Sequence, residues 1–302
     1  MEITFLGTSG CIPTEKRGLS AVAVDFLGEL LLFDCGEGTQ RQMRQIGLNF
    51  MRLDHIFLTH LHADHFLGLG GMIQSMDFLE RDRPLNIYGP PGVSETIRAL
   101  LTLGTFELET FKVNAREVSP GLVLDGERYT ISCAKTVHTR GSVAYCLEEK
   151  AHRKFDKPKA LALGIPEGRL YSKLQNGETV SVNGKTFTPD DVLDDPVPGR
   201  KLVYTGDTRP SKNIVKLAHG ADILIHDSMF SIEDEENTKE AAHSTTKEAA
   251  AIAKEAGAKK LYLTHISQRY TEPAKLEAEA REIFPESYVA EDLMRVKVQK
   301  RW

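Results

Sequence analysis

The sequence has 302 residues and a mass of 33.6 kDa, with 41% hydrophobic and 27% charged residues. These values are ordinary for a globular protein, and they exclude a disordered tail, a collagen and a mini-protein that needs disulfide bonds. The net charge of −5, from 38 basic and 43 acidic residues, excludes a protein that coats nucleic acid by its bulk charge.

The sequence shows no membrane or signal segment, and no two cysteines have CxxC spacing. No stretch approaches the roughly eighteen apolar residues of a membrane helix, and residues 1–7 have neither a basic region nor a cleavable apolar core. We therefore expect a soluble, cytoplasmic protein without a membrane partner. None of the cysteines has the spacing of a cysteine zinc cage, so we interpret all four as free, buried thiols in a reducing compartment. They are Cys11, Cys35, Cys133 and Cys146.

The first half of the chain alternates short apolar runs with helical segments. The helix predicted at 68–80 has a face of leucine and methionine, and Ser94 is predicted to cap the helix that follows it. Between and before these helices, β-branched and aromatic runs predict strands. Their ranges are 3–6, 21–26, 30–33, 55–59 and 85–88.

The second half continues the alternation. A helix is predicted at 245–256, with Ser244 or Thr245 as its cap. The predicted strands are 128–137, 142–147, 201–204, 222–225 and 260–263. This order of strands and helices predicts an α/β fold.

One stretch, from about 150 to 198, breaks the pattern because it has little periodicity and many Gly, Pro and Lys residues. Residues 150–173 hold seven Lys or Arg against two Asp or Glu, a local charge of +5, which leaves −10 for the rest of the chain. A structureless loop of this length is unusual in a compact domain unless it has a task. Two interpretations remain open, a solvated insertion with incidental charge and a basic arm that grips a polyanion.

The strongest chemical signal is the run His-Leu-His-Ala-Asp-His at residues 60–65. It places four possible metal ligands in six positions directly after a predicted strand. Imidazole nitrogen and carboxylate oxygen both suit zinc, and no thiolate accompanies them. The spacing favours a second metal beside the first.

More ligands are needed to complete two sites, and three residues at the ends of predicted strands supply them. His138, Asp207 and His265 each follow an apolar run. The carboxyl ends of strands form the active edge of an α/β sheet, so we expect these side chains to join the cluster.

This constellation resembles the metallo-β-lactamase superfamily, whose signature is HxHxDH followed by a distant His, Asp and His. The resemblance implies a four-layer αβ/βα sandwich with two zinc ions at one sheet edge. It implies that His60, His62 and His138 hold the first zinc ion and that Asp64, His65 and His265 hold the second. Asp207 would bridge both ions.

Further motifs narrow the resemblance to the tRNase Z family, which removes 3′ trailers from precursor tRNA. They are FLGTSG at 5–10, FDCGEGTQ at 33–40, GDTRP at 206–210, HST at 243–245 and HISQRY at 265–270. The resemblance runs from Met1 to near the C-terminus. It implies a single nuclease domain over residues 1–302 with an inserted tRNA-binding arm, the exosite, at about 150–198. It also implies a homodimer, and no DNA substrate is expected.

The expected mechanism follows from these residues. Two zinc ions can share and activate one water, which Asp64 would orient or deprotonate. His243 is the predicted general acid for the 3′-oxygen leaving group, oriented by Asp227. The family often has His-Glu-Ala-Thr where this chain has His-Asp-Ser-Met at 226–229, so the carboxylate of Asp227 is one methylene shorter. The product would be tRNA with a 3′-hydroxyl and a trailer with a 5′-phosphate.

Substrate contacts are predicted at two places. Thr208, Ser267 and Arg269 are candidates for holding a phosphate near the scissile bond, with Tyr270 as a further helper. The arm would read the shape of folded tRNA through its backbone phosphates and 2′-hydroxyls. The arm residues expected to contact tRNA are Lys154, Lys157, Lys159, Arg169 and Lys173.

Two other functions remain open on the sequence alone. A small-molecule phosphodiesterase or esterase of the same fold would keep every metal ligand but would not need the arm. A non-catalytic RNA-binding module would hold its zinc in a structural site. Structural zinc sites are closed and usually rich in thiolates, unlike this cluster.

Overall fold

The computed structural model describes residues 1–300, which divide into two compact units. The main unit comprises Met1–Glu148 and Lys201–Gln299, and the second unit is built on Glu149–Arg200, which we call the inserted segment. Each unit has its own hydrophobic core.

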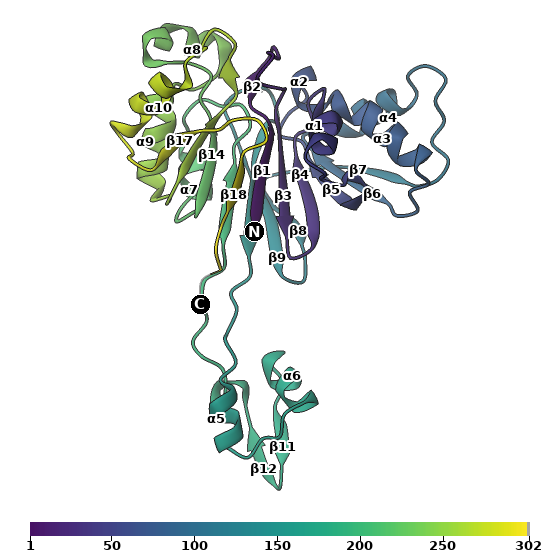
Figure 1. Cartoon of the computed structure of the whole chain (residues 1–302), viewed down its shortest axis with the longest axis vertical. Helices are drawn as coiled ribbons and strands as arrows, with labels where there is room; N and C mark the ends of the chain where they lie inside the picture. The colour runs from purple at the N-terminus through teal and green to yellow at the C-terminus, as the bar shows by residue number, and fades with distance from the viewer. Residues whose placement is uncertain (301–302) are drawn as a thin grey trace. The chain divides into compact units, whose positions relative to one another are not determined.

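Two seven-stranded sheets form the centre of the main unit (Figure 1). The first has the order β18-β1-β3-β4-β5-β6-β7, and the second has the order β17-β15-β14-β13-β10-β9-β8. The strands of the first sheet are β1 (Glu2–Gly7), β3 (Ala21–Phe26), β4 (Glu29–Phe33), β5 (Leu53–Phe57), β6 (Leu85–Gly89), β7 (Val113–Glu117) and β18 (Arg295–Lys297). Those of the second are β8 (Gly121–Asp125), β9 (Tyr129–Lys135), β10 (Val143–Glu149), β13 (Lys201–Tyr204), β14 (Ile223–Asp227), β15 (Leu261–Thr264) and β17 (Ser287–Val289).

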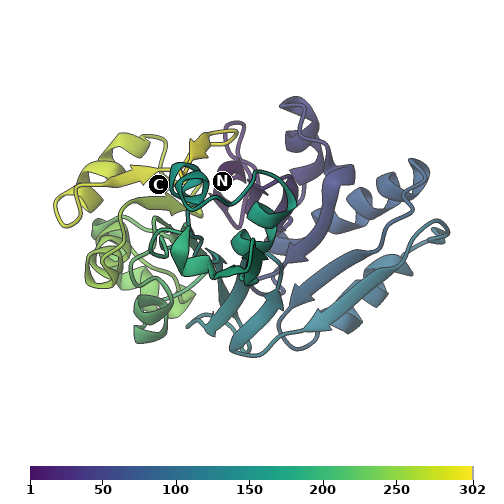
Figure 2. The same cartoon turned by 90° about the horizontal axis from the view of Figure 1, so that it is seen from below.

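Helices cover the outer face of each sheet, which gives four layers (Figure 2). The helices that pack on the first sheet are α1 (Thr39–Gln45), α3 (Gly68–Phe78) and α4 (Val93–Leu101). Those that pack on the second are α7 (Lys212–Leu217), α9 (Thr246–Ala256) and α10 (Pro273–Arg281). The expected αβ/βα sandwich is therefore the observed architecture of the main unit.

Shorter elements complete the main unit. The strand β2 (Ser9–Gly10) pairs in parallel with β16 (Ile266–Ser267). The remaining elements are α2 (Ala63–Phe66), α8 (Glu235–Ala241) and two 3-10 turns, η1 (Phe50–Arg52) and η3 (Ile232–Asp234).

Strand β3 shows how the sequence specifies this layering. Side chains alternate between the two faces of a strand. Val22, Val24 and Phe26 point into the core between the sheets, whereas Ala21 and Ala23 face the helices. A strand buried on both faces needs a continuous apolar run, and residues 21–24 of β3 form such a run before Asp25 interrupts it.

Helix ends were predicted with mixed success. Thr245 caps α9 as expected, with a capping box in which Glu248 bonds back to the Thr245 backbone. The prediction for Ser94 was wrong, because Gly92 is the N-cap of α4 and Ser94 lies inside the helix. Gly92 has a φ of 98°, a conformation that glycine adopts without steric strain, so the chain turns into the helix two residues earlier.

The inserted segment is folded, although the sequence at 150–198 shows little periodicity. Its core holds six buried residues, Ala160, Ile165, Leu174, Val180, Phe187 and Val192. Its elements are α5 (Lys157–Ala162), α6 (Arg169–Gln175), β11 (Val180–Val182), β12 (Lys185–Phe187) and the 3-10 turn η2 (Pro189–Asp191). Because none of these elements exceeds seven residues, the sequence shows no periodicity there.

A buried ion pair closes the two ends of the inserted segment. The guanidinium of Arg200 donates to both carboxylate oxygens of Glu149, at 2.7 and 3.0 Å, and both side chains are only 6% exposed. Removing one partner of such a pair leaves a buried charge and costs about 3–5 kcal/mol. Gly199 is required beside it, since a Cβ there would lie 1.9 Å from the Glu149 carbonyl oxygen.

Candidate metal centre

The HxHxDH run forms a turn after the parallel strand β5. His60 precedes α2, His62 is its N-cap residue, and Asp64 and His65 lie in its first turn. The short helix therefore folds four candidate ligands back toward one another. His60 and His65 are buried, and their ring centroids are 4.0 Å apart.

Three more candidate ligands reach the cluster from the second sheet. His265 directly follows β15 and adopts a φ of 60°. His138 and Asp207 lie three residues beyond β9 and β13, so the expectation that they end these strands was wrong. Each instead lies in the loop that follows its strand, and this loop brings the side chain to the other candidate ligands.

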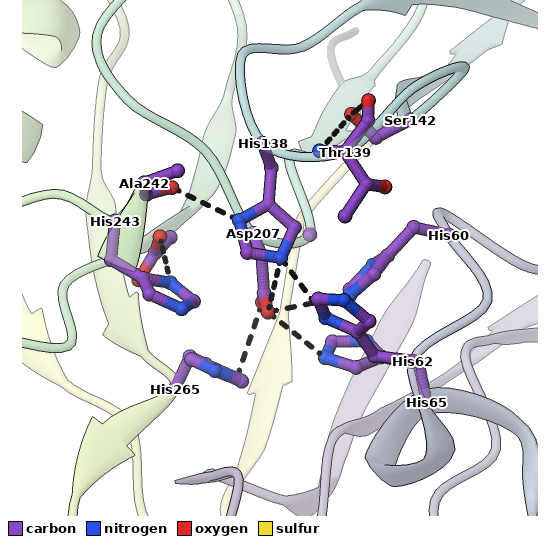
Figure 3. Close-up of polar contacts among 12 residues, drawn as sticks. His60, His62, His65, His138, Thr139, Ser142, Asp207, Ala242, His243 and His265 are labelled. Carbon is purple, nitrogen blue, oxygen red and sulfur yellow. Dashed lines mark hydrogen bonds and ion pairs between the residues drawn. The ribbon is translucent and has the colours of Figure 1, made fainter. Parts of the chain in front are cut away.

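The ligands form two groups that share Asp207 (Figure 3). The ligand atoms within each group all lie within 4.8 Å of one another. The first group is His60, His62, His138 and Asp207, and the second is Asp64, His65, Asp207 and His265. The structure thus assembles the same two sets, with the same shared carboxylate, that the superfamily resemblance implied.

Four buried polar atoms in the cluster have no hydrogen-bond partner, namely His60 Nε2, His65 Nε2, His265 Nε2 and Asp207 Oδ1. Buried polar atoms are nearly always satisfied, so unpartnered atoms gathered at one point indicate a ligand-binding site. The Nδ1 atoms of His60 and His65 are held in place by neighbouring side chains. His60 Nδ1 lies 3.1 Å from Thr59 Oγ1, and His65 Nδ1 lies 2.8 Å from Asp34 Oδ2. Such contacts orient an imidazole for metal binding, and the residues present fit a metal.

Electrostatics in the cluster keep Asp207 ionised. Burial alone would raise the pKa of Asp207, but the imidazoles of His265, His65 and His60 hold it well below its usual range. Burial alone would lower the pKa of His65, yet the carboxylates of Asp207 and Asp34 raise it well above its usual value. Asp207 is therefore an ionised carboxylate, whereas burial lowers the pKa of the His60, His138 and His265 imidazoles.

Asp34 is the functional residue that the sequence analysis missed. It is fully buried and accepts hydrogen bonds from Thr59 N at 2.7 Å and from the Tyr204 hydroxyl at 2.9 Å, besides its contact with His65. The available signal was an acidic residue directly after strand β4, inside the FDCGEGTQ motif. Its role is to position His65.

His243 and Asp227 form a second polar unit beside the metal groups. His243 Nδ1 lies 2.9 Å from Asp227 Oδ2, so the shorter carboxylate does reach the imidazole. Backbone N–H groups of Thr208 and Met229 hold Asp227 at 2.9 and 3.0 Å. Burial lowers the pKa of His243, but the carboxylate of Asp227 raises it to about 9. The ring stacks on His265 with centroids 5.0 Å apart.

The predicted phosphate contacts divide into three cases. Thr208 is fully buried and its hydroxyl donates to the Arg209 carbonyl at 2.7 Å, so a direct phosphate contact by Thr208 is not supported. Ser267 lines a cleft of about 490 Å³. Arg269 is half exposed, lies 3.3 Å from Asp234 and stacks over the Phe230 ring at 5.4 Å.

The interpretation of the four cysteines as buried thiols was wrong for one of them. Cys35, Cys133 and Cys146 are buried, whereas Cys11 is exposed. Its backbone N–H donates to Asp64 Oδ2 at 3.2 Å, which places it at the metal groups. Nothing in its sequence spacing had distinguished it from the other three.

The five arm residues expected to contact tRNA are all exposed on the inserted segment. The segment as a whole is less basic than residues 150–173, because its nine Lys or Arg face eight Asp or Glu over residues 149–200, a net charge of +1. Some of the acidic groups are engaged locally. Asp190 pairs with Arg153 at 2.6 Å, and Asp156 caps α5.

Curated proteins of known family match the chain over its whole length. A protein named ribonuclease Z from Methanothermobacter thermautotrophicus is 45% identical over 99% of this chain and 97% of its own. Another of that name from Archaeoglobus fulgidus is 47% identical over 98% of this chain and 97% of its own. The chain belongs to the ribonuclease Z family. This membership confirms the family resemblance that the sequence motifs indicated.

Solved structures share the fold of this chain, and two family models match parts of it. The human tRNase Z short form superposes with a TM-score of 0.74 at 29% identity, covering 99% of this chain and 100% of that one. The metallo-β-lactamase fold protein YhfI from Bacillus subtilis gives 0.70 at 22% identity, over 98% of each chain, and shows the same fold. Residues 1–154 match the family described as anti-Pycsar protein Apyc1, and residues 192–266 match the β-lactamase superfamily domain. Among residues 1–300, no helix has the length and apolar character needed to cross a bilayer.

Proposed function

We propose that the chain is a metal-dependent endoribonuclease that removes the 3′ trailer from precursor tRNA. The tRNA would keep a 3′-hydroxyl, and the trailer would carry a 5′-phosphate. One observation carries the proposal. In a chain of the ribonuclease Z family, two ligand groups share Asp207 next to a histidine–carboxylate pair able to donate a proton.

Two zinc ions per subunit are the proposed cofactors. His60, His62 and His138 would hold the first ion, Asp64, His65 and His265 the second, and Asp207 both. Nitrogen and oxygen donors without thiolates match catalytic rather than structural zinc sites. When bound, the ions would supply an activated water and neutralise the charge that builds up on the phosphate.

Asp64 is the proposed residue for orienting the attacking water and accepting its proton. Its carboxylate is only partly buried, at 12% side-chain exposure, unlike the fully enclosed Asp34. Burial would raise the pKa of Asp64, but His65 and His265 hold it below its usual range. The group is therefore ionised at neutral pH and able to accept a hydrogen bond from water.

His243 is the proposed general acid for the leaving 3′-oxygen. Because Nδ1 contacts Asp227, the proton available for transfer is the one on Nε2. A pKa of about 9 keeps the ring protonated at neutral pH, as a general acid requires. Asp227 orients the ring and stabilises its charged form.

The inserted segment is proposed as the tRNA-binding arm of a single nuclease domain. Five exposed cations, all within its first half, support contact with a phosphate backbone. They are Lys154, Lys157, Lys159, Arg169 and Lys173. We also propose that Ser267 and Arg269 contact a phosphate nearer the scissile bond, and that the chain acts in the cytoplasm as a homodimer.

The decisive experiment is cleavage of a 3′-extended precursor tRNA by the zinc-loaded protein, beside two variants. The first variant is Asp64→Ala. The second replaces residues 150–199 with an Asn-Gly turn, which the antiparallel pairing of Glu148 with Lys201 can accommodate. Hydrolysis of bis(p-nitrophenyl) phosphate is measured in parallel.

A single cut next to the discriminator base, lost in both variants, is the expected result. The segment-deleted protein should keep its activity on the small phosphodiester, whereas Asp64→Ala should lose both activities. No cut in tRNA together with full activity on the small ester would overturn the proposal and favour a small-molecule phosphodiesterase.

A further inference from the structure

Cys11 brings a thiol to the edge of the metal centre. It follows β2 on an exposed loop, and its sulfur joins a cluster with ring nitrogens of His243 and His265. The three potential ligand atoms all lie within 4.8 Å of one another. The other three cysteines are buried in the main unit, away from any such cluster among the described residues.

His243 is arranged as metal-binding histidines are. One ring nitrogen, Nδ1, contacts the buried carboxylate of Asp227 at 2.9 Å. A carboxylate on one nitrogen fixes the ring and raises the donor strength of the other. The Nε2 atom of His243 is therefore an oriented ligand as well as a proton donor.

His265 offers a buried nitrogen without a partner. Its Nδ1 atom lies 3.1 Å from Ser20 Oγ and 3.2 Å from Asp207 Oδ1, whereas Nε2 has no hydrogen bond and the residue is 1% exposed. A Cβ on Gly10 would lie 3.1 Å from this Nε2 atom. The unpartnered edge of the ring thus faces the loop that carries Cys11, and glycine at position 10 permits that approach.

The donor atoms of Cys11, His243 and His265 differ from those of the two ligand groups that share Asp207, because they include a sulfur. A thiolate with imidazoles is a soft combination that selects zinc and heavier thiophilic cations over magnesium or manganese. Bond lengths of about 2.0–2.3 Å require the ligand atoms to close up slightly, and one side-chain rotation of Cys11 on its exposed loop supplies that movement.

We propose that Cys11, His243 and His265 form a third, inhibitory site for a soft divalent cation, such as cadmium or zinc in excess. On binding, the thiol proton of Cys11 and the Nε2 proton of His243 pass to solvent, and two new bonds to the cation replace them. The inhibitory consequence rests on the proposed function, because the cation occupies the general acid. His265 also belongs to the second metal group, so the cation competes for a residue of that group.

The site is tested directly by cadmium titration of the zinc-loaded protein, followed by the ultraviolet charge-transfer band of cadmium–thiolate bonds. Wild type is compared with Cys11→Ser, in which the other three cysteines remain as an internal control. We expect a saturable band in wild type that Cys11→Ser lacks and that His243→Ala weakens at least tenfold in apparent affinity. An equal band in wild type and Cys11→Ser, or no band in either, would overturn the site.

Inhibition is measured on precursor tRNA with the same proteins. Without cadmium, Cys11→Ser should cleave within about twofold of wild type, since only its backbone contacts Asp64. The cadmium concentration for half inhibition should rise at least tenfold in Cys11→Ser, and manganese should inhibit neither protein through this site. Equal cadmium sensitivity would overturn the inhibitory role. Because the band needs no RNA, an inactive wild type with an intact band would count against the proposed nuclease and not against the site.

Discussion

The main unit and the inserted segment use polar residues in opposite ways. Around the metal groups, carboxylates and imidazoles such as Asp34, His65 and Asp227 are fully enclosed and fixed by neighbouring donors. In the segment, Lys157, Lys159 and the other arm cations project from short helices and are exposed. Chemistry at a phosphorus atom requires fixed geometry, whereas contact with a phosphate backbone requires only charge at an accessible surface.

The two units also differ in how their cores are built. The main unit distributes its core over two sheets and two sets of helices, whereas the segment depends on six buried residues and one buried ion pair. Substitutions in the segment should therefore alter RNA cleavage without altering the chemical step. Substitutions of the candidate metal ligands, such as Asp207, should remove both activities.

The largest effect is expected for Asp207→Ala. The change removes the one carboxylate common to both ligand groups, which also lies within 3.7 Å of a ring nitrogen of four histidines. Since a metal centre contributes several kcal/mol of transition-state stabilisation, both tRNA and small-ester turnover should fall at least about a thousandfold. Zinc content measured after dialysis should fall in parallel. Retention of two zinc ions with full small-ester activity would contradict the role of Asp207 as a ligand of both ions.

His243→Ala should separate two steps of the reaction. General acid catalysis contributes about 10²–10⁴ in rate when the leaving group is a poor one. A ribose 3′-oxygen needs a proton, whereas p-nitrophenolate does not, so tRNA cleavage should fall at least about a hundredfold and small-ester turnover should change little. Single-turnover rates on both substrates test this expectation. Equal losses on the two substrates would assign His243 to metal binding instead.

The same contrast explains what the sequence could reveal. The HxHxDH run, the apolar runs that precede Asp207 and His265, and the apolar residues of β3 are local signals, and each predicted its element or its candidate ligand. Asp34 escaped because its importance lies in contacts with Thr59 and Tyr204, which are 25 and 170 residues away along the chain. Cys11 was predicted to be buried but is exposed, because the exposure of its side chain depends on the conformation of the loop between β2 and β3. The segment escaped because elements of three to seven residues are too short for a period to show.

Reversing charge on the segment should give a smaller effect confined to RNA. The double substitution Lys157→Glu and Lys159→Glu changes two exposed side chains on α5, and we expect roughly a tenfold rise in KM for tRNA with kcat unchanged. The slope of log KM against log salt should fall by about one for each tRNA phosphate that the arm no longer neutralises. A matched control is Lys212→Glu with Lys216→Glu on α7, where two exposed lysines lie in the main unit. Equal effects of the two pairs would mean that long-range charge, and not the arm, governs binding.

The smallest expected effect is a shift in pH dependence. A general acid works only while protonated, and Asp227 raises the pKa of His243 to about 9. Activity on tRNA should therefore hold through neutral pH and fall as the pH rises through about 9. Asp227→Asn removes the charge that favours imidazolium, so the alkaline limb should move to lower pH, while small-ester turnover should keep its own profile. The measurement is kcat on both substrates between about pH 6 and pH 10. This interval spans both the ordinary pKa of histidine and the raised pKa of His243. An alkaline limb that stays in place in Asp227→Asn would show that a group other than His243 supplies the proton, and the chemistry of the main unit would then need another donor.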